Sequence, residues 1–226
     1  MAARRSRNPR GTISRNAVLE AALAVAHRKG LRGVTIRAVA AEVGAPPMSL
    51  YTHFERKEQL IDRMFEHVLD RIFAAAGRPS WREELEASAH EARTLLLAHP
   101  HWLPLFTRVI APTSALRPFE GLLKAMRKEG FSTEAAIEAV SAAMAFTLGL
   151  VLVERMMAGR EGVAVPKAQL ELVKKLIPEL PPGRYPFIEA AVSRSAHWTF
   201  DVVFDSGLRS LIAGIELGRK GPHRAR

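Results

Sequence analysis

Apolar residues recur every three or four positions along most of the chain, and this spacing predicts helices. The first helix is expected to begin after Ser14, which can cap it, and to end at Gly30. A second begins after Thr35, whose hydroxyl can accept a backbone N–H, and ends at Gly44. Because helices are predicted along most of the chain, the predicted fold class is all-α.

The stretch from Thr35 to Lys57 predicts two short helices around a tight turn. Two prolines follow Gly44; they cannot continue the first helix, but proline suits the first turn of the next. The second helix is expected over about Pro47 to His53, with Leu50 and Phe54 facing inward. This is the shape of a helix-turn-helix, whose second helix enters the DNA major groove. On these residues alone, an ordinary helical hairpin is the alternative.

The net charge of +10 is concentrated at the two ends of the chain. Residues 1–78 have a net charge of +7, residues 79–218 of −1, and residues 219–226 of +4. A basic part attached to a neutral one is typical of a nucleic-acid binder with a second module. A basic surface kept for solubility is the alternative, but it does not explain why the helix-turn-helix candidate falls in the basic part.

The run from Ala17 to Leu60 resembles the DNA-binding domain of the TetR family of bacterial repressors. The resemblance rests on the G-x-x-G-x-T step that ends at Thr35 and on the I-R-x-V-A-x-x-V-G helix that follows. It rests above all on S-L-Y-T-H-F-x-x-K-E-x-L, from Ser49 to Leu60. The resemblance implies sequence-specific binding to double-stranded operator DNA.

Nine side chains of this stretch are expected to contact DNA: Thr35, Arg37, Pro47, Met48, Ser49, Tyr51, Thr52, His53 and Lys57. Arg37 can reach a guanine edge or a phosphate. Tyr51 can offer its ring to a thymine methyl or its hydroxyl to a phosphate, although packing against the first helix is the alternative. His53 and Lys57 resemble the family's phosphate contacts, which position a protein without recognising sequence. Met48 and Thr52 differ from the residues of some relatives, so the operator cannot be copied from them.

We expect four segments along the chain. Residues 1–13 form a flexible basic arm that follows phosphates or the minor groove, or else a floppy tail. Residues 14–59 form the helix-turn-helix domain, residues 60–218 a helical ligand-binding and dimerisation domain, and residues 219–226 a basic tail. Helices of the larger domain are expected over about 57–76, 80–98, 119–128, 134–158, 167–177 and 196–217, with a proline-rich connection over 178–186.

The segment F-D-V-V-F-D-S-G-L-R-S-L-I-A, which begins at Phe200, resembles the terminal helix of TetR-type C-terminal domains. The resemblance implies that helices 134–158 and 196–217 pair with their copies in a homodimer. An intramolecular core is the alternative. Dimerisation suits a helix-turn-helix protein, because such proteins bind two half-sites about one helical turn or a multiple apart.

A pocket for an unknown small-molecule effector is expected between helices of the larger domain. Its candidate lining comprises aromatic and methionine side chains with three polar ones: His67, His90, Arg93, Trp102, Phe106, Met126, Met144, Phe146 and Met156. Core packing is the alternative for each. In tetracycline repressors a histidine late in the linker helix contacts the drug, and Phe73 takes that place here, which gives no support for a magnesium–tetracycline ligand.

Several classes of protein are not supported by the sequence. The chain has no cysteine, no glycine-rich phosphate loop and no G-x-S-x-G elbow. His99 and His101 lack companions at metal-ligand spacing. The longest uncharged run, 139–153, has 15 residues and is shorter than the roughly 20 of a membrane helix. We expect no enzyme activity, no cofactor, no metal and no membrane partner, and a cytoplasmic location because the N-terminus lacks a secretory signal.

The leading interpretation is a ligand-responsive, sequence-specific DNA-binding transcriptional repressor that acts on a roughly palindromic operator. The first alternative is a non-specific architectural DNA-binding protein that depends on the basic ends. The second is a ligand carrier whose helix-turn-helix is vestigial. Affinity for random DNA separates the three, because the repressor prefers its operator, the architectural protein has no preference, and the carrier does not bind.

Overall fold

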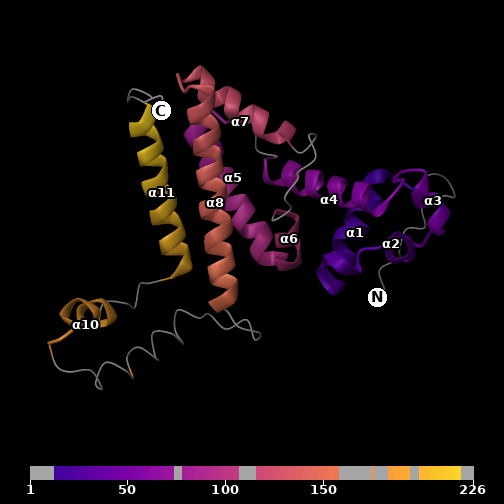
Figure 1. Ribbon diagram of the computed structural model, residues 1–226, viewed down its shortest axis with the longest axis horizontal. Coiled ribbons are helices and arrows are strands. Elements are labelled where there is room, and N and C mark those ends of the chain that lie inside the picture. Colours follow the sequence, from indigo (N-terminus) through magenta and orange to yellow (C-terminus); the bar gives the residue numbers. More distant parts are fainter. Residues whose placement is uncertain are drawn as a thin grey trace, which may run out of the picture. The chain divides into compact units, whose positions relative to one another are not determined.

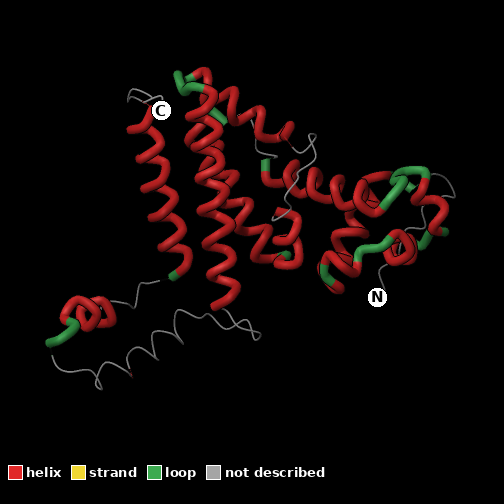
Figure 2. Tube along the Cα trace, in the orientation of Figure 1, coloured by secondary structure: helices red, strands yellow, loops and turns green. Residues whose placement is uncertain are grey.

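The computed structural model describes residues 13–73, 78–106, 116–157, 175, 183–193 and 199–219. Every regular element among these residues is helical, which confirms the predicted fold class, and Figure 2 colours the described residues as helices and loops. The chain divides into two units. The first comprises Met1–Arg71 and His99–Pro118, and the second comprises Ile72–Ala98 and Phe119–Arg226.

The first unit contains the amino-terminal helices and a short segment that follows α5. Its elements are α1 (Arg15–Lys29), the 3-10 turn η1 (Leu31–Gly33), α2 (Ile36–Val43), α3 (Pro47–Tyr51), α4 (Lys57–Ile72), η2 (Pro100–Trp102) and α6 (Leu103–Phe106). The last residue of α4 already belongs to the second unit. Helix α2 packs against both α1 and α3, which gives the three-helix arrangement of a helix-turn-helix domain (Figure 1).

The helix ends of this unit follow from single polar residues and one glycine. The hydroxyl of Ser14 accepts a hydrogen bond from the Ala17 amide at 3.2 Å, and Thr35 caps α2 in the same way. Gly44 ends α2 with φ 75° and ψ 35°, a left-handed conformation that disfavours other residues. These caps confirm the predicted starts of α1 and α2.

Helix α3 is shorter than predicted, because it ends at Tyr51 and not at His53. The Thr52 hydroxyl donates to the carbonyl oxygen of Ser49 at 2.7 Å, and this oxygen would otherwise accept the His53 amide in an α-helix. The His53 amide donates instead to Leu50, at 3.0 Å, and closes a tighter turn. Leu50 and Phe54 are both fully buried, as predicted.

The second unit is built on three long helices. Its elements are α5 (Trp81–Ala98), α7 (Arg117–Lys128, of which the first two residues belong to the first unit), α8 (Thr133–Met157), α10 (Pro186–Ser193) and α11 (Phe200–Arg219). Helix α8 packs against α5 and α11, and the three run side by side in Figure 1. Ser80 caps α5 by accepting from the Glu83 amide, and Ser132 caps α8 by accepting from Ala135.

Several predicted boundaries are wrong. Helix α4 ends at Ile72 and not near residue 76, while α11 begins at Phe200, where the Thr199 hydroxyl accepts the Val202 amide, and not near residue 196. Helix α7 begins before Phe119, because Pro118 fits within a first turn. Helix α10 was not predicted, although it opens on a proline. The arm up to residue 12, the tail after Arg219 and, apart from position 175, the expected helix over 167–177 lie outside the described residues.

Helix α8 is long and apolar enough to cross a membrane, by length and composition alone. It contacts α5 and α11, and it buries Ala136, Val140 and Val151 against the unit. Its last two turns include the charged pair Glu154 and Arg155. We therefore interpret α8 as the central helix of the second unit.

Candidate nucleic-acid interface and apolar cavity

The nine predicted DNA contacts all lie outside the protein core. Six of them are exposed and three are half-buried: Thr35, Arg37, Pro47, Met48, Tyr51 and Thr52 are exposed, and Ser49, His53 and Lys57 are half-buried. Their roles in DNA binding stay predictions, but each of these residues is at least partly accessible to a ligand.

The exposed face of α3 is defined by the burial of Leu50 on its opposite side. Leu50 is 0% exposed, whereas Met48 is 73% exposed and Tyr51 is 48% exposed. Residues three or four apart lie on one face of a helix, so Met48 is a neighbour of Tyr51 and Thr52. This face therefore consists of large, outward-facing side chains that contribute little to the core.

Two basic residues lie on the helices before and after α3. Arg37, near the start of α2, is exposed, and no ion pair or hydrogen bond of its guanidinium occurs among the described residues. Lys57 opens α4, and its ammonium lies 3.4 Å from the carbonyl oxygen of Arg32, at the edge of hydrogen-bonding distance. An ion pair between Arg28 and Glu42 joins α1 to α2. Arg37 thus keeps its charge available for a ligand outside the chain.

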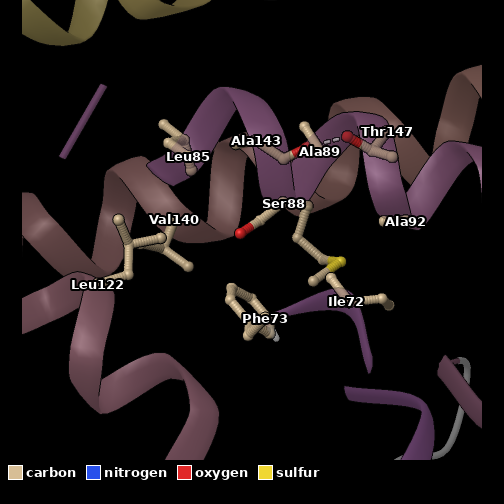
Figure 3. Close-up of a pocket in the computed structure, with 11 residues that line it drawn as sticks. Ile72, Phe73, Leu85, Ser88, Ala89, Ala92, Leu122, Val140, Ala143 and Thr147 are labelled. Carbon is tan, nitrogen blue, oxygen red and sulfur yellow. Dashed lines mark hydrogen bonds between the residues drawn. The ribbon is translucent and has the colours of Figure 1, made fainter. Parts of the chain in front are cut away.

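The second unit contains a small apolar cavity between α5, α7, α8 and the end of α4. Its volume is about 20 Å³. It is lined by Ile72, Phe73, Leu85, Ser88, Ala89, Ala92, Leu122, Val140, Ala143, Met144 and Thr147. In Figure 3 the Ser88 hydroxyl points into the space between Val140 and Phe73. The Thr147 hydroxyl is already occupied, since it donates to the Ala143 carbonyl oxygen at 2.8 Å. Ser88 is therefore the hydroxyl that the cavity offers a ligand.

Of the predicted effector residues, Met144 lines this cavity. Met126 is fully buried elsewhere in the unit, Phe146 stacks on Phe204, and Met156 is 74% exposed. The assignment of these side chains to an effector site stays a prediction.

The predicted polar contacts Arg93 and His90 both lie beside carboxylate groups of other helices. Arg93 binds Glu154 at 3.0 Å and Asp201 at 2.7 Å, which joins α5 to α8 and α11. Burial alone would lower the pKa of Arg93, but hydrogen bonds to Asp201 and Glu154 raise it above its ordinary value. His90 lies 3.7 Å from an Asp205 carboxylate oxygen. These groups stabilise the helix packing, and neither lines the cavity.

The remaining predicted effector residues belong to the first unit. His67 lies 2.7 Å from a Glu20 carboxylate oxygen, and Phe106 packs edge-on against Phe65. Trp102 is 3% exposed and stacks on His99, with ring centroids 4.0 Å apart.

The His99 ring has an unusual environment for a histidine. Its Nδ1 is buried without a hydrogen-bond partner among the described residues, and His27 lies edge-on at 5.5 Å. Burial lowers the pKa of His99 below its ordinary value, and the neighbouring His27 and Arg71 lower it further. Among the described residues, no group of three His, Asp or Glu side chains is placed to hold a metal ion.

Sequence reasoning missed most of the cavity. The lining positions Ser88, Ala89 and Ala92 are small side chains on α5, and the space exists because they are small. The search for a pocket among large aromatic and methionine residues could not detect such positions. A run of small residues on the buried face of a helix was the available signal.

Two family models match most of the chain. The model described as "Bacterial regulatory proteins, tetR family" matches residues 18–64, and the model described as "Tetracyclin repressor-like, C-terminal domain" matches residues 73–218. The first match covers α2 and α3, and the second covers the whole lining of the cavity except Ile72.

Individual proteins are also similar to this chain over most of its length. The HTH-type transcriptional repressor DrrR1 of Streptomyces coeruleorubidus is 32% identical over 95% of this chain and 81% of its own length. The class A tetracycline repressor protein from transposon 1721 of Escherichia coli is 26% identical over 88% of this chain and 89% of its own. The solved structure of SCO7222, a TetR from Streptomyces coelicolor, has a TM-score of 0.75 and 24% identity over 92% of this chain and 100% of that one.

Proposed function

Since the chain belongs to the tetR family of bacterial regulatory proteins, we propose that α2 and α3 bind its operator and that an apolar effector in the second-unit cavity controls this binding. The protein is a ligand-responsive, sequence-specific DNA-binding transcriptional repressor that acts as a homodimer. The alternative of a non-specific architectural DNA-binding protein is not supported, because the relatives that match this chain are repressors.

In this proposal, the exposed side chains of α2 and α3 make the DNA contacts. Met48 and Tyr51 face the base edges, while Arg37 reaches a guanine or a phosphate. Lys57 contributes a point charge that orients the protein on the backbone. The exposure of these side chains and the absence of a competing ion pair for Arg37 among the described residues support this assignment.

The observation that connects the cavity with DNA binding is the position of Ile72 and Phe73 in its lining. Ile72 is the last residue of α4, and the rest of α4 belongs to the unit that contains α2 and α3. A molecule in the cavity therefore touches the end of the helix that leads directly from the DNA-binding unit. Such a ligand shifts the DNA-binding equilibrium only if it binds the two forms unequally.

The cavity supports an uncharged, mostly apolar effector with one hydrogen-bonding group. None of its lining residues carries a charge, and Ser88 supplies the accessible hydroxyl. Burying a charge here without a partner would cost far more than apolar contacts return. Although relatives include tetracycline repressors, a magnesium chelate has no ligand among these side chains.

The homodimer is proposed to form through α8 and α11. Both helices expose large apolar side chains: Ile137, Leu152, Val153 and Met156 on α8, and Val202 and Leu217 on α11. A groove between the two helices is lined largely by small residues, among them Ala135, Ala142 and Gly214. Small residues let helices of a second copy approach closely, and the apolar side chains are then removed from water.

We also propose that the protein has no catalytic activity and works in the cytoplasm. The matched relatives are regulators and not enzymes, which supports the first part. The cytoplasmic location follows from DNA binding, because the operator of a bacterial repressor lies in the cytoplasm.

A screen of small molecules for operator release tests the effector proposal, with Ala143→Phe as the variant that fills the cavity. We expect the active molecules to be uncharged and to have no effect on Ala143→Phe, which still binds operator. Molecules that release wild type and Ala143→Phe at equal concentrations would place the effector elsewhere. Thermal denaturation shows whether the variant is folded.

A further inference from the structure

The chemistry of the exposed α3 face restricts what it can recognise. The residues Pro47–Tyr51 form α3, and Met48, Tyr51 and the adjacent Thr52 share its outer side. Bidentate recognition of guanine requires arginine or lysine, and that of adenine requires asparagine or glutamine. The sequence PMSLY contains none of these four residue types. Helix α3 therefore cannot make the contacts that most strongly distinguish guanine or adenine.

The groups that remain on this face are largely apolar. Met48 ends in a methyl group on a thioether, which is at best a weak hydrogen-bond acceptor. The Thr52 side chain is exposed, and its hydroxyl donates its hydrogen to the Ser49 carbonyl oxygen, so towards DNA it offers a methyl group and an acceptor oxygen but no donor. Tyr51 offers the face of a ring. The remaining polar groups, the hydroxyls of Ser49 and Tyr51 and the acceptor oxygen of Thr52, form single hydrogen bonds that different bases can satisfy.

The major groove has one apolar feature that such a face can recognise, the C5-methyl group of thymine. We propose that α3 selects its operator half-site through thymine methyl groups, with at least two A·T pairs facing Met48 and Tyr51. The proposal deepens the proposed function and rests on it. Arg37 is the one Arg or Lys side chain in α2 and α3, so guanine recognition in the half-site is assigned to it.

The test uses the full-length dimer and begins with selection of bound duplexes from random DNA. In the selected duplex, each half-site thymidine is then replaced by deoxyuridine, which removes the methyl group and keeps base pairing. Removal of one methyl group that α3 touches should weaken binding about fourfold. Removal of four such groups, two in each half-site, should weaken binding on the order of a hundredfold.

Variants assign the effect to α3. Met48→Ala should reduce the preference for thymidine over deoxyuridine, whereas Met48→Leu, which keeps an apolar side chain of similar size, should retain it. Lys57→Ala is the matched control; it should weaken both duplexes equally and leave their ratio unchanged. Because Met48 is 73% exposed, its replacement leaves the core intact, and thermal denaturation checks this.

Three results would overturn thymine recognition. They are equal affinity for the two duplexes, a ratio that Met48→Ala does not change, and selected half-sites without thymine at the positions protected by α3. Each of these still shows sequence-specific binding and leaves the proposed function intact. Selection that enriches no sequence would instead contradict the proposed function itself.

Discussion

At the scale of single residues, Arg37 and Lys57 have the same charge but different predicted roles. Arg37→Ala should cost about 1–3 kcal/mol of operator binding and relax preference at one position. Lys57→Ala should weaken binding to every sequence and reduce the slope of log affinity against log salt by about one. Titrations of operator and random duplexes at several salt concentrations measure both effects.

One result for each residue would contradict its predicted role. An Arg37→Ala variant that loses affinity equally for operator and random DNA makes only a phosphate contact. A Lys57→Ala variant with an unchanged salt slope makes no phosphate contact.

His99 predicts a dependence of stability on pH. Its pKa is lowered in the folded chain by burial and by His27 and Arg71, so the unfolded chain binds the proton more readily. The free energy of unfolding should therefore fall as the pH drops below about 6.5, the ordinary histidine value, toward the lower folded pKa. Urea denaturation between pH 5 and pH 8 measures this for the wild type and for His99→Gln. An equal loss of stability in both proteins would assign the effect to other groups.

At the scale of elements, the contact between α8 and α11 depends on Gly207. A Cβ atom at this position would lie 2.6 Å from the Cζ of Phe146, closer than packing permits. Alanine is the better helix former by about 1 kcal/mol, but overpacking costs about 1–3 kcal/mol. Gly207→Ala should thus lower the free energy of unfolding by about 1 kcal/mol.

The matched background for this prediction is Phe146→Ala, where the obstructing ring is absent. There, Gly207→Ala should stabilise the protein, since only the gain in helix propensity remains. Urea denaturation of the four proteins gives both values, and the same effect in the two backgrounds would show that Phe146 does not limit the approach of α11.

The helices were predictable from sequence to the extent that local residues determine their ends. Ser14, Thr35 and Gly44 act on their immediate neighbours, and each helix end was predicted from that residue type alone. The end of α3 was not predicted correctly. The Thr52 hydroxyl competes for the Ser49 carbonyl oxygen, and the spacing of apolar residues gives no sign of this competition. Helix α10 was missed because its first residue, Pro186, was assigned to the proline-rich connection over 178–186 and not to the first turn of a helix.

At the scale of the whole molecule, the helix-turn-helix was predictable and the cavity largely was not. The nine DNA candidates are close in sequence, so one short motif predicts them together, and their contacts with DNA stay predictions. The cavity combines residues from four helices whose contacts arise only from packing, with small side chains on α5 facing Leu122 and Val140. Trp102, a large side chain that was predicted to line the pocket, stacks instead on His99 in the first unit.

The dimer face of α8 and α11 makes a further prediction at this scale. A double variant, Leu152→Glu with Met156→Glu, should convert the dimer to a monomer, because it places two charges on neighbouring turns of the exposed face. Operator binding should fall with it, since two half-sites require two DNA-binding units. Sedimentation velocity measures the assembly state. Leu116→Glu, an exposed leucine of the first unit, is the control that should remain dimeric.

The most direct test of sequence-specific repression is the ratio of two dissociation constants at physiological salt. One is measured on a duplex selected from random DNA, and the other on a random duplex of the same length. We expect the selected duplex to bind at least about 10³-fold more tightly. Equal dissociation constants that change together with salt would contradict the account and leave a protein that coats DNA through charge alone.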